Sequence, residues 1–158
     1  MSPRSVPLSA AILSTWFCTA AIVSAQEIGN PNAPAVEIRI GAVLASSIGQ
    51  NFDNRLASLR RQFDSLLPYS SYRLIQEERR RIAWQREAEF RLPGRRYLLV
   101  IPREYKDGRV ALNVMLVQGA RTVVNTSVSL RNNGTFLVGG PHHEDGVLII
   151  AIGASKIR

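Results

Sequence analysis

The stretch Val147-Leu148-Ile149-Ile150-Ala151-Ile152 decides the fold, because it carries no polar residue on either face of a strand. Successive side chains of a β-strand point to opposite faces of the sheet. A short apolar run between Gly146 and Gly153 therefore predicts a central strand that is covered on both sides. The rest of the chain must supply apolar residues to cover both faces of that strand.

Most of the remaining chain alternates apolar and polar residues, which is the pattern of half-buried strands. Turn residues separate the segments: Pro93-Gly94, Asp107-Gly108 and Asn132-Asn133-Gly134. The asparagine-glycine turn is a strong hairpin signal, and it predicts that the strand after it pairs back with the strand before it. The alternating segments are residues 36–42, 72–75, 82–92, 110–116, 124–130 and 136–138, and residues 97–101 form a short apolar run that predicts a buried strand.

One amphipathic helix is predicted over residues 52–67. Asn51 would cap its N-terminus, and Pro68 prevents its continuation. Its apolar residues fall on one stripe, so we expect it to lie against the sheet. The sequence thus predicts an α+β fold, with a mainly antiparallel sheet of about seven to eight strands and the helix packed on it after the first strand. The stripe consists of Phe52, Leu56, Leu59, Phe63, Leu66 and Leu67.

The N-terminus has the pattern of a secretory signal. Arg4 precedes an uncharged apolar stretch, and Val23-Ser24-Ala25 offers small residues for signal peptidase. We therefore expect a cleavable signal peptide at residues 1–25, a proline-broken linker at 26–35 and a single domain at 36–155. The expected location is the periplasm or the exterior of a bacterium, with no stable transmembrane span after cleavage. Cys18, the one cysteine, would leave with the signal, which excludes thiolate chemistry from the mature chain.

The chain is strongly basic, with a formal net charge of +8 at pH 7, and its basic residues other than Lys106 and Lys156 are arginines. Guanidinium groups bind carboxylate and phosphate bidentately. The arginines of residues 79–103 therefore form a candidate binding strip for an envelope protein or an anionic surface; a solvated basic face is the alternative. Nucleic acid is not an expected partner outside the cytoplasm. The candidate binding residues are Arg79, Arg80, Arg81, Arg95 and Arg96.

A second candidate site is the segment His142-His143-Glu144-Asp145, predicted to lie in a loop. Imidazole and carboxylate groups are suitable ligands for zinc, copper or nickel, although a complete site would need a further ligand from elsewhere. No Gly-x-Ser-x-Gly motif and no phosphate-binding glycine loop occurs in the sequence. No cofactor is therefore expected, and catalysis would have to rely on this segment.

The segment Thr126-Ser127-Val128-Ser129-Leu130-Arg131-Asn132-Asn133-Gly134-Thr135-Phe136-Leu137-Val138-Gly139-Gly140-Pro141 resembles a strand-turn-strand pattern in the core domain of bacterial secretins. Secretins are ring-forming outer-membrane channels. Here Pro141 and the histidines replace the family's usual continuation after Gly-Gly. The resemblance therefore implies a small envelope domain with similar strand-turn chemistry, and it does not imply a channel.

Two functional hypotheses follow from these observations. The first is an exported, non-catalytic binding or assembly domain of the envelope, which acts through a sheet edge or the arginine-rich face. The alternative is a small secreted hydrolase or metal-dependent enzyme that uses His142 to Asp145. The partner and the oligomeric state are left open by the sequence.

Overall fold

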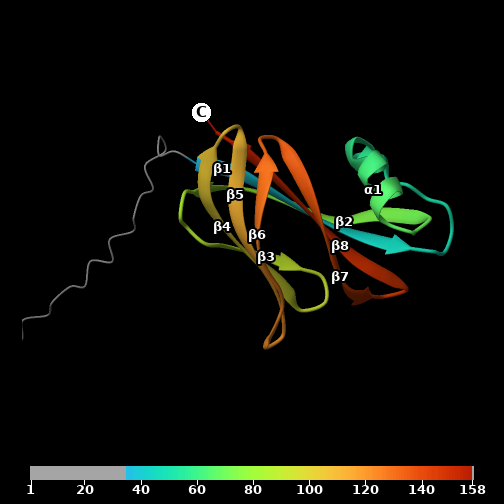
Figure 1. Ribbon diagram of the computed structural model, residues 1–158. Helices are drawn as coiled ribbons and strands as arrows, with labels where there is room; N and C mark the ends of the chain where they lie inside the picture. Colours follow the sequence, from blue (N-terminus) through green and yellow to red (C-terminus); the bar gives the residue numbers. More distant parts are fainter. Residues whose placement is uncertain (1–34, 158) are drawn as a thin grey trace, which may run out of the picture. The chain divides into compact units, whose positions relative to one another are not determined.

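The computed structural model describes residues 35–157 of the chain, which fold into two four-stranded sheets (Figure 1). The predicted signal peptide and almost all of the predicted linker lie outside the described residues. Sheet A has the order β2-β1-β8-β7 and sheet B the order β3-β4-β5-β6, and every neighbouring pair is antiparallel. Sheet A comprises β1 (Ala35–Ser46), β2 (Ser71–Ala83), β7 (Gly134–His143) and β8 (Gly146–Lys156), and sheet B comprises β3 (Ala88–Leu92), β4 (Arg96–Lys106), β5 (Arg109–Gln118) and β6 (Arg121–Arg131).

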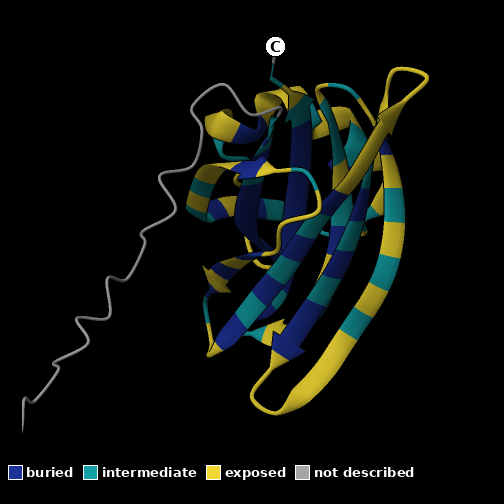
Figure 2. Ribbon diagram, turned by 90° about the vertical axis from the view of Figure 1, so that its left-hand side faces the viewer, coloured by how far each residue is buried: buried dark blue, intermediate teal, exposed yellow. Residues whose placement is uncertain are grey.

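The number of strands agrees with the prediction, but the expectation of one sheet is wrong. The main core lies between the two sheets and includes Ile38, Phe90, Leu112 and Ile150. Buried and exposed residues alternate along many of these strands (Figure 2). Alternation indicates only that one face of each strand is buried. A second sheet can cover that face as well as a helix can, so alternation does not distinguish one sheet from two.

Strand β8 confirms the interpretation of the apolar run. It is a central strand of sheet A, between β1 and β7. Leu148, Ile150 and Ile152 belong to the core between the sheets. Ile149 belongs to a second core on the opposite face of sheet A, and Val147 packs against that core. The strand has no polar face because sheet B covers one side and a helical segment covers part of the other.

The helical segment is shorter than predicted and begins later. A 3₁₀ helix, η1 (Asn54–Leu59), precedes the short α-helix α1 (Arg60–Leu66). Asp53, rather than Asn51, caps η1 by accepting a hydrogen bond from the Arg55 backbone N–H. The chain before this point pairs with β2, since Tyr72 donates its N–H to Asn51 and its carbonyl accepts from Asp53. That pairing keeps residues 51–53 extended.

The helical segment nevertheless packs against sheet A, as predicted. Leu56 and Phe63 are buried in the second core, against Val43 and Ile149. In Figure 1, α1 lies on the side of sheet A away from β4 and β5. Leu66 is 66% exposed and leaves the predicted apolar stripe, whereas Leu67 packs against the second core.

Two turns carry the chain from one sheet to the other. The predicted strand over residues 82–92 is broken, because β2 ends at Ala83 and β3 begins at Ala88 in the other sheet. The predicted hairpin at Asn132-Asn133-Gly134 is also wrong: β6 lies in sheet B, and β7 pairs with β8 in sheet A. The Asn133 backbone N–H donates to the carbonyl of Ala154, and the Asn132 side chain accepts from the Lys156 N–H. These bonds tie the turn to the end of β8.

The cap of η1 predicts a pH dependence of stability. Hydrogen bonds from the side chain and backbone of Arg55 lower the pKa of Asp53 from 3.8 to about 2. A pKa that is lower in the folded state adds stability above the unfolded value, and this contribution is lost as the pH falls from 3.8 towards 2. We expect Asp53→Asn to destabilise the protein at neutral pH and the difference from wild type to shrink across this range.

Urea denaturation at a series of pH values measures this difference. Asp107→Asn is the matched control, because Asp107 lies in an exposed turn at φ 51°, a conformation that asparagine also adopts. A difference between wild type and Asp53→Asn that stays constant from pH 3.8 to pH 2 would contradict the assignment.

Candidate functional site

The open half of the outer face of sheet A is the candidate site, and we call it the arginine face. It consists of the polar side chains of β1 and β2 that point away from sheet B. A bulge in β2 produces this arrangement, since the register passes from Val43↔Leu74 to Ala42↔Gln76 and leaves Ile75 without a partner. Before the bulge Leu74 faces the helical segment, and after it Ile82 faces sheet B. The arginine face comprises Glu37, Arg39, Glu77, Arg79 and Arg81.

Strand register places these side chains in rows across the sheet. Arg39 lies opposite Arg79 on one side and Gly153 on the other, and Glu37 lies opposite Arg81. A Cβ at Gly153 would lie 3.4 Å from Nε of Arg39 and 3.5 Å from its Nη2. The Arg39 guanidinium therefore lies across β8, within contact distance of Gly153.

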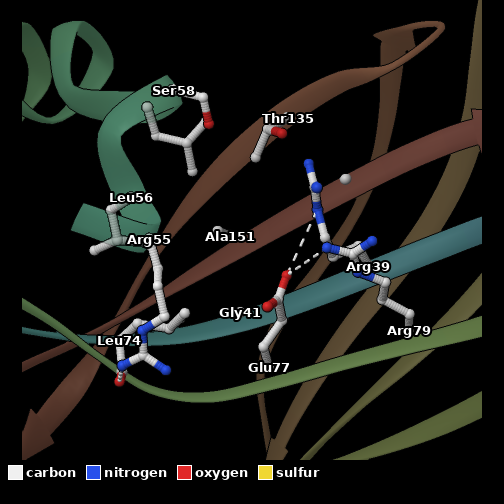
Figure 3. A pocket seen from close by; sticks show the side chains of 12 residues that line it. Arg39, Gly41, Arg55, Leu56, Ser58, Leu74, Glu77, Arg79, Thr135 and Ala151 are labelled. Carbon is white, nitrogen blue, oxygen red and sulfur yellow. Dashed lines mark hydrogen bonds and ion pairs between the residues drawn. The ribbon is translucent and has the colours of Figure 1, made fainter. Parts of the chain in front are cut away.

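A hollow of about 280 Å³ lies between these rows and the helical segment (Figure 3). Its floor is made of small residues, because Gly41 lies opposite Ala151 in the neighbouring strand. Its walls combine guanidinium groups with apolar side chains from η1 and β2. The wall residues are Arg39, Arg55, Glu77 and Arg79, together with Leu56, Ser58, Leu59, Leu74 and Thr135.

Positive charge predominates around the hollow, where three guanidinium groups face one carboxylate. Glu77 Oε1 lies 3.4 Å from Arg79 Nη2 and 4.0 Å from Arg39 Nε (Figure 3). Arg55 is held separately, since its Nη2 lies 2.7 Å from both Asp53 Oδ2 and the carbonyl oxygen of Leu74. The contacts of Glu77 are long, so Arg39 and Arg79 retain capacity to donate to another anion.

The structure brings together two of the five arginines that the sequence singled out. Arg79 and Arg81 lie on the arginine face, two residues apart on β2. Arg80 points to the other side of the strand, where its guanidinium lies 4.8 Å from the centre of the Phe90 ring. It pairs with Glu78 and donates to the carbonyl of Glu89, so it helps to fasten β2 to the edge strand β3.

Arg95 and Arg96 lie at the turn between β3 and β4. Arg95 is exposed in a left-handed conformation, with φ 56°. Arg96 is 7% exposed and donates to the carbonyl oxygens of Pro93 and His142, at 3.1 and 2.9 Å. It thereby links sheet B to β7 of sheet A, so its guanidinium group connects the two sheets and does not lie on the arginine face.

Sequence reasoning missed Arg39, Arg55 and Glu77. Arg39 belongs to the polar side of a predicted strand, and its neighbours depend on which strand pairs with β1. One signal was present, because Gly153 interrupts an apolar strand, and such a glycine marks the close approach of another group. That group is the guanidinium of Arg39.

The histidine segment is not a loop. His142 and His143 end strand β7, and a tight turn at Glu144-Asp145 leads directly into β8. Glu144 Oε2 lies 3.6 Å from Arg73 Nη2, and its Oε1 lies 4.0 Å from His143 Nε2. Within residues 35–157 no three histidine, cysteine or acidic side chains form a group that could hold a metal ion.

No helix within residues 35–157 is both long and apolar enough to cross a membrane.

Comparisons with known proteins include a weak structural likeness. No family model and no curated protein matches the chain. A solved structure of the secretin InvG from the Salmonella SPI-1 type III secretion injectisome, residues 176 to the end in the open gate state, is similar over 79% of this chain. The identity is 11%, the TM-score is 0.32, and the match covers 59% of the InvG chain. The secretin resemblance is therefore found again as a weak and partial one, which by itself carries no functional argument.

Proposed function

We propose that this chain is an exported binding or assembly domain of the bacterial envelope, and that it contacts its partner through the arginine face. The secretory pattern of residues 1–25 supports export. The observation that carries the proposal is the excess of guanidinium groups around a hollow in the part of sheet A that neither sheet B nor the helical segment covers. The partner presents carboxylate or phosphate groups to this face.

The chemistry of the face suits such a partner. Arginine donates through a planar fork that matches the two oxygens of a carboxylate or phosphate. Arg39 and Arg79 lie on adjacent strands, so sheet pairing fixes their backbones relative to each other. Their half-exposed side chains are accessible to a partner. Because the contacts are charged and near solvent, binding should weaken as the salt concentration rises.

The proposal is tested by the triple variant Arg39→Ser, Arg79→Ser and Arg81→Ser. We expect it to lower partner capture by about tenfold or more, since each exposed charged contact contributes up to about 1 kcal/mol. Capture is measured by in-cell cross-linking and purification from envelope fractions, with quantitative mass spectrometry. Sedimentation with vesicles that contain anionic phospholipid measures binding to a lipid surface in parallel.

A matched control removes the same charge from sheet B. Arg91, Arg121 and Arg131 are exposed on β3 and β6, and their replacement by serine leaves the arginine face intact. We expect this control to retain wild-type capture and vesicle binding. Equal capture and equal vesicle binding by the arginine-face variant and wild type would refute the proposal.

A further inference from the structure

Glu77 occupies the position in the hollow that an anionic ligand would take. Its carboxylate lies between Arg39 and Arg79, at 4.0 and 3.4 Å. Arg79 is two residues away on the same strand, and Arg39 is on the neighbouring strand. The Glu77 side chain is 37% exposed, so it can rotate towards solvent without crossing the core. Its departure would leave two guanidinium groups facing the hollow.

The wall opposite these guanidinium groups contains apolar side chains beside Arg55 and Ser58. Leu56 and Leu59 of η1 and Leu74 of β2 line it, above the floor of Gly41 and Ala151. Phosphate or another fully hydrated anion would gain nothing from these side chains, whereas an aliphatic group would bury apolar surface against them. A volume of about 280 Å³ is at the small end for ligand pockets. The hollow therefore fits a few carbon atoms attached to one anionic group.

We propose that this hollow binds a carboxylate carried by a short branched or linear apolar group, and that the incoming carboxylate displaces Glu77 from Arg39 and Arg79. The inference rests on the proposed role of the arginine face and names the chemistry that the face recognises. Two sources present this chemistry: a free short-chain acid, and the C-terminus of a polypeptide that ends in an apolar residue.

Titrations followed by the backbone amide signals of the purified protein test the inference. Isovalerate is the first probe, and its neutral amide is the matched control ligand. A tripeptide ending in leucine, with a free or an amidated C-terminus, distinguishes a chain end from a free acid. We expect isovalerate to shift the signals of Gly41, Ala151 and Gly153, and the two amides to shift none of them.

Two variants test the role of Glu77 and the place of binding. Glu77→Gln removes the competing carboxylate and should tighten isovalerate binding by about fivefold. Glu89→Gln removes an exposed carboxylate from sheet B and should leave the affinity unchanged. Gly153→Val places a branched side chain in contact with the Arg39 guanidinium and should weaken isovalerate binding. Its thermal midpoint and amide spectrum show whether the variant remains folded.

The outcomes separate this inference from the proposed function. If neither isovalerate nor the free peptide binds, or if Glu77→Gln weakens binding, the inference is wrong. Loss of envelope capture in the arginine-face variant would then still support the proposed function. The converse result is that Glu77→Gln tightens isovalerate binding while the arginine-face variant keeps wild-type capture. That result would support the ligand-binding inference and refute the proposed function.

Discussion

Replacing Phe63 by alanine should lower the free energy of unfolding by about 3–5 kcal/mol, the usual cost of removing a buried phenylalanine. Phe63 is 0% exposed and lies between α1 and sheet A. Its ring centre lies 4.7 Å from that of Tyr72 and 6.2 Å from that of Phe52. The variant therefore loses transfer energy, aromatic contacts and the packing that holds the helical segment to the sheet. Urea denaturation measures the change.

Leu66→Ala is the control within the same helix. Leu66 is 66% exposed, so we expect a change of less than about 1 kcal/mol. Leu56 and Leu59 of the same helical segment line the hollow, so Phe63→Ala should also weaken the binding of any ligand there. Equal destabilisation by the two variants would show that this helical segment is not anchored through Phe63.

Replacing Arg96 by alanine is expected to lower the free energy of unfolding by about 2–4 kcal/mol. Each hydrogen bond from a charged donor contributes about 1.5–3 kcal/mol. The buried Nε of Arg96, which has no hydrogen-bond partner, offsets part of the contribution of the two bonds. The carbonyl oxygens of Pro93 and His142 would lose the guanidinium that joins them. Arg96→Met, which keeps an unbranched apolar chain, should recover part of the loss by filling the space.

Arg95→Asn is the matched control for Arg96. It removes the neighbouring charge, and asparagine tolerates the φ of 56° at this position. We expect a change within about 0.5 kcal/mol, because Arg95 is exposed. Similar effects of the two substitutions, in denaturation or in partner capture, would contradict the structural assignment of Arg96.

The structure places only some of the predicted binding arginines on one face, because side chains of a strand alternate between its two faces. The run Arg79-Arg80-Arg81 is contiguous in sequence, but successive residues of a strand point to opposite faces. The run therefore supplies two arginines to the arginine face and directs Arg80 towards β3. Arg39 joins the face from β1, about 40 positions earlier in the chain, through strand pairing that no local pattern encodes.

The difference between local patterns and long-range strand pairing also explains the errors in the predicted fold. The signal at Asn132-Asn133-Gly134 correctly predicts a reversal of the chain, and Asn133 has the expected left-handed φ of 64°. It cannot predict which strand the chain joins after the turn. Pairing of β7 with β8 places Val138 of β7 in the core between the sheets, and the turn is fixed by its bonds to β8.

Local sequence patterns were enough to predict the β-rich class, the approximate number of strands, most of the turns and the doubly covered last strand. These features follow from local periodicity and from the backbone preferences of glycine, proline and asparagine. Three features instead depend on long-range packing: the division into two sheets, the bulge at Ile75, and the position of Arg39, Glu77 and Arg79 around one hollow. Periodicity specifies that one face of a strand must be buried, whereas long-range packing selects the partner that buries it.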